Sequence, residues 1–247
     1  MKRVAMSWLQ PNWPAPATVH AASTLRTGGV SAPPFDSFNL ALHVGDAADA
    51  VRENRTRLSQ LLRLPAEPCW LEQVHGSHVV EVATYVTPPA ADACIARAAN
   101  QVCAVMTADC LPVLFCSLDG DRVAAAHAGW RGLAAGILES TVSSLGLPGS
   151  QLLAWFGPAI GPQAFAVGDE VRIAFTARDA ATVTAFQRNT NGQWLADIYH
   201  LARLELARLG VHAVYGGDAC TVSDEARFFS YRRDGQTGRM ASLIWIE

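Results

Sequence analysis

Residues 107–130 read TADCLPVLFCSLDGDRVAAAHAGW, and this stretch decides the fold. Two apolar runs flank residues 118–121 (LDGD), and an Asp-Gly pair between such runs is a strong signal for a β-hairpin with a two-residue turn. With the Asp-Gly pair at the centre of the turn, the numbers of facing residues sum to 239, so that His127 faces Pro112. Residues two apart share a face of a strand. The register therefore predicts that Cys110 and His127 project from the same face at the open end of the hairpin.

The segments on either side of this hairpin mix strands and helices without strict alternation. Apolar runs bounded by turn residues predict strands over residues 18–25, 68–74, 78–86, 102–117, 122–127, 151–156 and 241–246. Apolar residues at helical spacing predict helices that begin at Asp46, run from Trp130 to Gly146, from Asp169 to Thr176, and from Asp197 to Gly210. Asp46 is the expected N-cap of the first helix. This mixture predicts an α+β layered domain with mixed sheets.

The bulk composition narrows the class of protein. The chain has 247 residues, half of them hydrophobic and 17% charged, which is enough apolar material for a sizeable core. With no internal repeat, low-complexity tract or long linker, residues 1–247 are expected to form one domain. The net charge of −3 gives no basic face for nucleic acid. A monomer is the default expectation, because no heptad or interface pattern appears.

The compartment that the sequence indicates is the cytoplasm. No apolar run reaches the roughly 18 residues that a membrane span needs. The short apolar part of residues 1–16 is interrupted by Gln10, Pro11 and Asn12, which argues against a signal peptide. The six cysteines form no C-x-x-C pair, and in a chain of this length they are expected to be reduced thiols. Those predicted to be core or near-core thiols are Cys69, Cys94, Cys103, Cys116 and Cys220.

Cys110, His127 and His75 form the candidate catalytic group. Pro112 limits regular strand pairing next to Cys110, and the small residues after His127 let the backbone approach a ligand closely. His75 ends an apolar strand and precedes a glycine. One thiolate and two imidazoles make a good catalytic zinc set, because a fourth position stays open for water whose pKa the metal lowers toward neutrality. An inert buried cysteine and structural histidines would also fit the pattern, and His78 competes with His75.

Three further features are candidates for binding anions or orienting ligands. Residues 26–31 (RTGGVS) predict either a cradle, in which Arg26 and backbone N–H groups hold an anion, or a surface loop with a tight turn. Arg232 and Arg233 are expected either to bind phosphate or to pair with carboxylates. Asp109 would orient a ligand, act as an acid or base, or cap a turn.

On these and other motifs the chain resembles the YfiH-like family, whose members are variously labelled multicopper polyphenol oxidase (laccase), purine nucleoside phosphorylase and peptidoglycan editing factor. The resemblance covers nearly the whole chain. The motifs that carry it are residues 26–31 (RTGGVS), 39–40 (NL), 43–46 (HVGD), 53–55 (ENR), 70–76 (WLEQVHG), 91–93 (ADA), 107–112 (TADCLP), 127–132 (HAGWRG), 157–161 (GPAIG), 228–233 (FFSYRR) and 237–240 (TGRM). The motifs around Cys110 and His127 are the most specific.

The resemblance implies a layered α/β/β/α fold similar to cysteine-hydrolase-like toxin domains. It also implies that His75, Cys110 and His127 are catalytic and hold a metal, zinc or else copper. The implied reactions are phosphorolysis of adenosine, inosine and methylthioadenosine and deamination of adenosine, so purine nucleosides and phosphate are the expected partners. The motif residues that are candidates for substrate binding are Arg26, Asn39, Gln73, Arg131 and Arg232.

Two other enzyme classes and one non-enzymatic role stay open. In a metal-free cysteine hydrolase, Cys110 would attack an amide or acyl bond, as in peptidoglycan-precursor editing, with His127 as the base. A copper-dependent polyphenol oxidase is disfavoured, because one cysteine and few histidines cannot build several copper centres. A scaffold or partner-binding protein would keep its function after His75, Cys110 and His127 are replaced.

Overall fold

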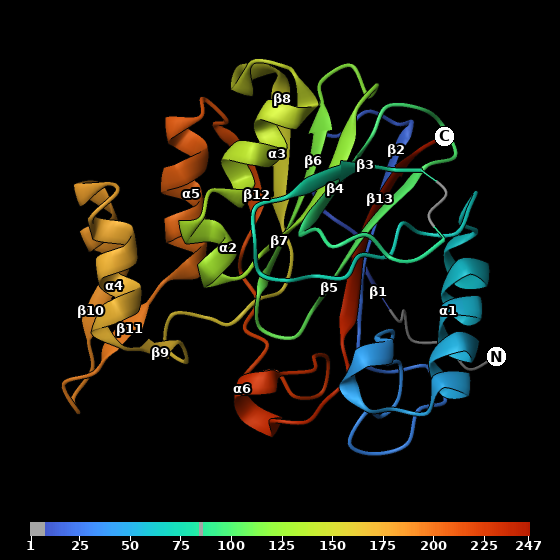
Figure 1. The fold of residues 1–247 in the computed structure, drawn as a ribbon, viewed down its shortest axis with the longest axis horizontal. Helices are drawn as coiled ribbons and strands as arrows, with labels where there is room; N and C mark the ends of the chain where they lie inside the picture. Colours follow the sequence, from blue (N-terminus) through green and yellow to red (C-terminus); the bar gives the residue numbers. More distant parts are fainter. Residues whose placement is uncertain (1–7, 84–85) are drawn as a thin grey trace.

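The computed structural model describes residues 8–83 and 86–247, and its strands form two large sheets and one small sheet (Figure 1). The strands are β1 (Trp8–Leu9), β2 (Val19–Thr24), β3 (Val79–Glu81), β4 (Ala93–Ala96), β5 (Val102–Thr107), β6 (Leu111–Ser117), β7 (Val123–Ala128), β8 (Leu152–Phe156), β9 (Ala166–Val167), β10 (Phe186–Arg188), β11 (Trp194–Ala196), β12 (Ala213–Gly216) and β13 (Met240–Ile246). The helices are α1 (Ala48–Leu62), α2 (Trp130–Ala134), α3 (Ile137–Leu145), α4 (Asp169–Thr176), α5 (Ile198–Arg208) and α6 (Tyr231–Asp234), with short 3-10 turns η1 (Leu42–Val44), η2 (Gly149–Gln151) and η3 (Ala180–Ala185).

Both large sheets are built from segments distant in the sequence. The six-stranded sheet has the order β12-β8-β6-β7-β4-β3, and the four-stranded sheet has the order β1-β2-β13-β5. Parallel pairs β12–β8 and β3–β4 occur beside antiparallel ones in the larger sheet. The predicted α+β fold with mixed sheets is therefore confirmed.

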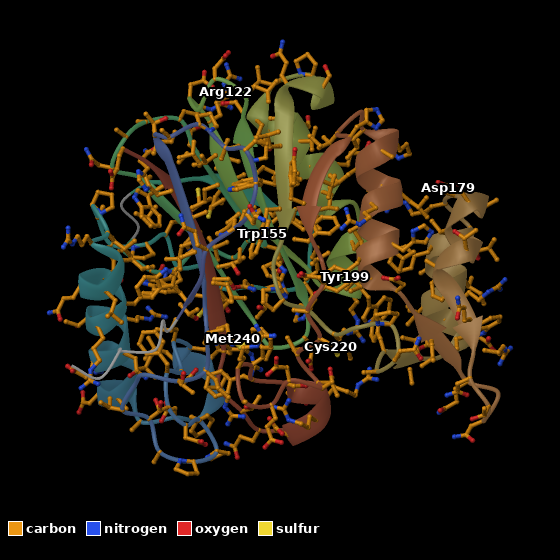
Figure 2. The ribbon with its side chains drawn as sticks, turned by 180° about the vertical axis from the view of Figure 1, so that it is seen from behind. Arg122, Trp155, Asp179, Tyr199, Cys220 and Met240 are labelled. Carbon is orange, nitrogen blue, oxygen red and sulfur yellow. The ribbon has the colours of Figure 1, made fainter. Side chains whose placement is uncertain are left out.

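Three apolar layers show how the sheets and helices stack. Side chains of α3 and α5 pack on one face of the six-stranded sheet. The opposite face, including the buried Trp155 at the centre of Figure 2, packs against β5 and β13 of the four-stranded sheet. Leu58 of α1 packs on the outer face of the four-stranded sheet. The order of layers is thus α/β/β/α, while the similarity to cysteine-hydrolase-like toxin domains stays a prediction.

A small lobe extends this arrangement at one side. The three-stranded sheet, of order β10-β11-β9, lies with α4 beside α5 (Figure 1). Phe175 of α4 and Phe186 of β10 are buried in the same apolar cluster as α5. The lobe therefore shares a core with the helices that cover the six-stranded sheet.

The hairpin has the register predicted from its turn. Pro112 of β6 pairs with His127 of β7, and Val113 pairs with Ala126. Every pair in the ladder keeps the predicted sum, although the predicted two-residue turn is wrong: residues 118–121 form the loop, and the N–H of Gly120 donates to the C=O of Ser117 at 3.1 Å, which puts Leu118 and Asp119 at the centre of the turn. The open end of the hairpin therefore carries Cys110 and His127 as expected.

The prediction of one continuous strand over residues 102–117 is wrong. The run divides into β5, which pairs with β13 in the four-stranded sheet, and β6, which belongs to the six-stranded sheet. Asp109, with a φ of 96°, lies between them in a left-handed conformation that no strand accommodates. The apolar run therefore crosses from one sheet to the other at a corner next to Cys110.

The strands predicted over residues 68–74 and 78–86 are largely wrong. Within the first, only isolated bridges join Cys69 to Cys103 and Glu72 to Ala90. The side-chain amide of Gln73 takes the place of a ladder, because it binds both the N–H and the C=O of Met106 at 2.7 and 2.8 Å. Of the second, β3 covers three residues, and residues 84–85 lie outside the described part of the chain.

Two helix predictions need correction and two are confirmed. Asp46 is not the N-cap of α1, since Ala47 holds that position without a side-chain bond. The helix predicted from Trp130 to Gly146 divides into α2 and α3, because Gly136, with a φ of 91°, interrupts it. The helix α4 has the predicted bounds, and Asp197 caps α5 by accepting the N–H of His200 at 2.9 Å.

Other expectations concern the cysteines and membranes. All six thiols are free, and the ones buried between the sheets are Cys69, Cys94, Cys103 and Cys116. Among the helices of residues 8–83 and 86–247, none combines the length and hydropathy that a membrane span requires. Residues 1–7, on which part of the signal-peptide argument depends, lie outside the described residues.

Candidate metal centre

Three segments bring His75, Cys110 and His127 together. His127 lies in β7, Cys110 immediately precedes β6, and His75 lies in the loop ahead of β3. Their ligand atoms all lie within 4.8 Å of one another. Sγ of Cys110 is 3.9 Å from Nε2 of His75, and the two imidazole rings meet edge to face with centroids 4.8 Å apart. His75 is exposed, Cys110 half-buried and His127 buried, so this trio opens to solvent on the His75 side.

Gly129 lets the chain pass close to these side chains. A Cβ at this position would lie 2.9 Å from Sγ of Cys110 and 3.0 Å from Cδ2 of His75. Glycine avoids that overlap because it has no Cβ. The close backbone approach predicted after His127 is therefore present, and the trio itself requires it.

Asp92, immediately before β4, fixes two members of the trio. It is fully buried, and its Oδ1 accepts Nδ1–H of His127 at 2.8 Å and the backbone N–H of His75 at 2.9 Å. Its Oδ2 accepts the N–H of Gly76 at 2.6 Å and of Val74 at 3.2 Å. The carboxylate therefore leaves Nε2 of His127 free to face Cys110, and it holds the loop that presents His75.

The charges in the group favour a thiolate. Burial acts to raise the pKa of Cys110, but the positive charge of His127 and hydrogen bonds from both histidines lower it below its usual value. Burial acts to lower the pKa of His127, but the Cys110 charge and the bond to Asp92 raise it. Burial also acts to raise the pKa of Asp92, but its bonds from His127 and Gly76 lower it. The metal-free pair is thus a thiolate facing an imidazolium.

The trio forms part of the wall of a cavity of about 470 Å³, a size typical of small-molecule sites. One part of the wall is apolar and largely aromatic, and it includes Trp130, Ile160, Phe165 and Ile198. Another part of the wall carries basic side chains, those of His43, Arg131, Arg232 and Arg239. The cavity can therefore hold a flat apolar ring together with an anionic group.

Three of the predicted substrate-binding residues line this cavity. Gln73 does so beside the trio, although its amide is committed to β5. Arg131 rests with its guanidinium carbon 4.5 Å from the centre of the Trp130 ring. Arg232 donates from Nη1 to the C=O of Ala166 at 2.9 Å. The structure thus brings Gln73, Arg131 and Arg232 to the trio.

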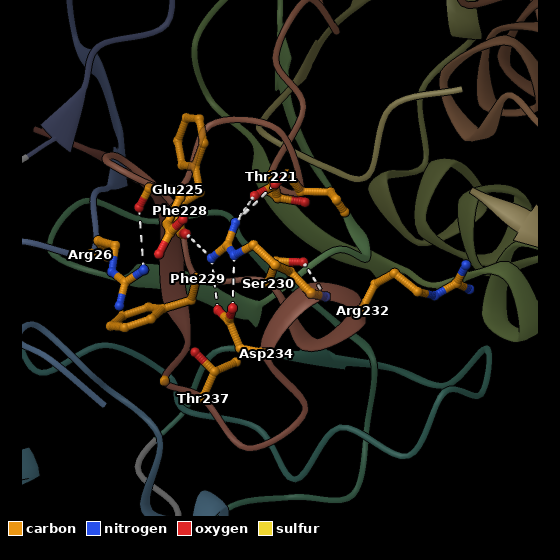
Figure 3. Close-up of polar contacts among 12 residues, drawn as sticks. Arg26, Thr221, Glu225, Phe228, Phe229, Ser230, Arg232, Asp234 and Thr237 are labelled. Atoms are coloured by element: carbon orange, nitrogen blue, oxygen red, sulfur yellow. Dashed lines mark hydrogen bonds and ion pairs between the residues drawn. The ribbon is translucent and has the colours of Figure 1, made fainter. Parts of the chain in front are cut away.

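Arg26, predicted to bind an anion, is held elsewhere. Its guanidinium donates to the C=O of Asp36 at 3.1 Å and of Glu225 at 3.2 Å, and it lies over the ring of Phe229 (Figure 3). In the same view Arg232 extends away from this cluster. Arg26 is therefore not among the residues that line the cavity.

The predicted cradle at residues 26–31 has its donors occupied. The N–H groups of Gly28 and Gly29 both donate to Oγ of Ser37 at 3.1 Å, and that of Val30 donates to Oδ1 of Asn54 at 2.9 Å. The expectation of an anion cradle is wrong for this geometry, because the protein's own side chains satisfy the groups that an anion would need.

Removing the Arg26 side chain is expected to affect stability and not phosphate binding. The Arg26→Ala variant loses two hydrogen bonds and an ion pair with Asp36, which together stabilise the fold by about 1–3 kcal/mol. Thermal unfolding should shift down while the KM for phosphate is unchanged. The exposed Arg52→Ala variant serves as control, and a raised phosphate KM for Arg26→Ala alone would restore the cradle.

Asn39 is also absent from the cavity wall. It is fully buried, its Nδ2 donates to Oδ2 of Asp46 at 2.9 Å, and its Oδ1 accepts the backbone N–H of Arg239 at 3.0 Å. Its predicted contact with substrate is therefore replaced by a contact with Arg239, which does line the cavity.

Asp109 and Arg233 have structural roles. Oδ1 of Asp109 accepts the hydroxyl of Thr221 and Oδ2 accepts the backbone N–H of Arg232, both at 2.6 Å. Arg233 pairs with Asp234 and donates to the C=O of Thr221. For Arg233 the carboxylate pair is the alternative observed, whereas Asp109 binds a distant hydroxyl and an N–H of α6 and also lines the cavity, so its role toward a ligand stays a prediction.

Sequence reasoning gave no role to three residues of the site. His43, Asp92 and Arg239 lie within the motifs at residues 43–46, 91–93 and 237–240, but no spacing relates them to the trio. The one signal available in the sequence was the position of Asp92 between two alanines, because a carboxylate that is buried among apolar residues needs hydrogen-bond donors.

The trio suits a metal ion by its chemistry. It offers one thiolate and two imidazoles with one side open, and the buried Asp92 supports a histidine in the way that outer carboxylates do at zinc sites. Fold and site together define a class of mixed α+β proteins with a Cys–His–His candidate metal centre beside a cavity.

The comparisons with known proteins place the chain within this class. A model of the family described as multi-copper polyphenol oxidoreductase laccase matches residues 20–247. The chain belongs to this family, whose members include YfiH proteins.

Relatives and solved structures agree over nearly the full length. The chain is 58% identical to a protein of Pseudomonas aeruginosa named purine nucleoside phosphorylase, with 98% of this chain and 99% of that protein covered. It is 56% identical to Escherichia coli purine nucleoside phosphorylase YfiH, with 96% and 97% covered. A Neisseria meningitidis crystal structure matches with a TM-score of 0.94 and 50% identity, covering 98% and 100%.

Proposed function

We propose that this chain is a metal-dependent purine nucleoside phosphorylase that holds zinc with His75, Cys110 and His127 and also deaminates adenosine. The observation that carries the proposal is the convergence of three ligand atoms within 4.8 Å of one another in the wall of the cavity. The names of the relatives support the nucleoside and phosphate as substrates. Adenosine, inosine and methylthioadenosine are the proposed nucleosides.

Zinc fits the donor set, and copper is the competing metal. Thiolate and imidazole suit both ions, so metal analysis of the purified protein decides between them. When bound, zinc supplies Lewis acidity on the open side of the trio. Asp92 keeps Nε2 of His127 directed at the ion, and the Cys110 thiolate adds the negative charge that holds it.

The rest of the cavity positions the nucleoside and the phosphate. The purine packs against the aromatic wall at Trp130 and Phe165, which excludes water from one side of the substrate. The basic side of the cavity wall attracts the phosphate dianion and holds it near the ribose. An oxygen of phosphate then bonds to the anomeric carbon as the glycosidic C–N bond breaks. The electron pair of the C–N bond leaves with the purine, which takes up a proton.

A product screen on protein of known metal content tests this function. Inosine and methylthioadenosine should yield free purine and sugar phosphate only with added phosphate, and adenosine should also yield inosine. Chelation should abolish both reactions and zinc should restore them. Zinc-loaded protein that leaves every nucleoside unchanged would refute the proposal.

A second candidate is a metal-free cysteine hydrolase, and the thiolate–imidazolium pair of Cys110 and His127 favours it. The predicted similarity to cysteine-hydrolase-like toxin domains belongs with this candidate, and a peptidoglycan-precursor amide would be its substrate. Chelated protein should then hydrolyse amides, and zinc should inhibit it. A multi-copper oxidase fits less well, since the trio is the one three-residue ligand group found within residues 8–83 and 86–247.

A further inference from the structure

One half-buried arginine of the cavity forms no direct ion pair with the described residues. Arg239 immediately precedes β13, and its Nη1 donates to the C=O groups of Thr237 and Gly238 at 2.9 and 3.0 Å. Within the described part of the chain, its Nε and Nη2 have no hydrogen-bond partner and the guanidinium has no ion pair. Neither nitrogen is among the fully buried unpaired polar atoms of the described residues, so both can be reached from the cavity. Its free donors are therefore available to an anion in the cavity.

The other arginines near the cavity differ from Arg239 in this respect. Arg26 and Arg233 each pair with a neighbouring aspartate. Arg232 is exposed, and its Nη1 donates hydrogen bonds to backbone carbonyls. Arg131 is exposed and stacks on an indole ring. The guanidinium carbon of Arg239 also lies over an aromatic ring, 5.8 Å from the centre of Tyr231, but among these five arginines it is the one that combines partial burial with unused donors.

The surroundings of Arg239 are positively charged. His43 lies in the same cavity wall. Burial is the largest of the causes that lower the pKa of its imidazole, and the positive charges of Arg239 and Arg55 lower it further. A lowered pKa favours the neutral imidazole, which has one N–H to donate. The negative charges of Cys110 and Asp109 also act on Arg239, although burial has the larger effect on its pKa. Arg239 thus connects a cationic corner to the trio.

The loop behind this corner holds Arg239 in place. Oδ1 of Asn39 accepts the N–H groups of Arg239 and Ala41, both at 3.0 Å, and the N–H of Leu40 donates to the C=O of Arg239 at 3.3 Å. The backbone of Arg239 is therefore fixed on both sides. A fixed backbone restricts the guanidinium and prepares it for a ligand.

We infer that Arg239 and His43 form a subsite for a tetrahedral oxyanion, the phosphate co-substrate, in the wall of the cavity next to Cys110. The inference rests on the proposed function for the identity of the anion. It replaces Arg26 as the phosphate ligand, and it makes Asn39 a positioning residue for Arg239.

The test measures phosphate affinity in the zinc-loaded protein. Losing a charged hydrogen-bond donor should raise the phosphate KM of Arg239→Gln roughly 10- to 100-fold, while the KM for inosine changes little. The Arg239→Lys variant keeps the charge and should recover part of the affinity. Arg52→Gln, which removes the same charge from exposed α1, should behave as wild type.

Two further arms separate the outcomes. Calorimetric titration with inorganic phosphate, in the presence of hypoxanthine, tests the subsite even if no nucleoside is cleaved. Phosphate binding unchanged in Arg239→Gln, or lowered as much in Arg232→Gln, would overturn the subsite without touching the proposed function. A nucleoside 5′-monophosphate that binds more tightly than phosphate would overturn the assignment to the free co-substrate.

Discussion

The Cys110→Ala variant is expected to lose its metal and both proposed activities. The thiolate is one of the three candidate ligands and supplies the only negative charge of the trio, so its removal leaves only two imidazoles to hold a metal. The loss of zinc affinity should exceed the roughly 10- to 100-fold cost of removing an outer partner. Metal content after dialysis and competition with a chromophoric chelator measure it.

The Cys220→Ala variant provides the matched control for Cys110. Cys220 is also a free, half-buried thiol, but it does not line the cavity that contains the trio. It should keep wild-type zinc content. Iodoacetamide adds a second readout, because zinc should protect Cys110 from alkylation. A Cys110→Ala protein that binds zinc with unchanged affinity would show that the metal lies elsewhere.

Replacing Asp92 by asparagine should lower zinc affinity by roughly 10- to 100-fold. All four groups that contact this carboxylate are N–H donors, from His127 and the loop that presents His75. In asparagine an NH2 group replaces one oxygen and faces an N–H group that can no longer donate to it. One histidine ring must therefore rotate, or the loop that presents His75 must move.

A spectroscopic measurement distinguishes this positioning role from a loss of folding. The cobalt-substituted Asp92→Asn protein should show an altered visible spectrum while its circular dichroism matches wild type. The Asp49→Asn variant, at an exposed carboxylate of α1, is the control for the change of group. Wild-type zinc affinity and spectrum in Asp92→Asn would mean that the carboxylate serves the fold alone.

The part of the site predicted from sequence depends on a local signal. The short loop at residues 118–121 fixes the register of β6 and β7, and the register alone places Cys110 and His127 on one face. His75 reaches the same point through Asp92 and Gln73, whose partners lie 16 to 35 positions away, and no local pattern encodes such contacts.

The errors in the predicted fold have the same origin. The run of residues 102–117 is apolar on both sides of Asp109, because both β5 and β6 are buried on both faces, and the single acidic residue does not by itself reveal the corner. The loop of residues 26–31 has the composition of an anion cradle. Ser37 and Asn54 fill it, and only the folded loop brings them there.

The position of β13 has a consequence for how the chain is made. This strand lies between β2 and β5, so that Ser242 meets Ser23 across 219 positions. A nascent chain on the ribosome cannot close that sheet until residues 240–246 have emerged, and contacts of such long range form slowly. We expect β2 and β5 to present unpaired edges until β13 has emerged, and the Cys110 corner, which follows β5, to settle only after β13 has paired.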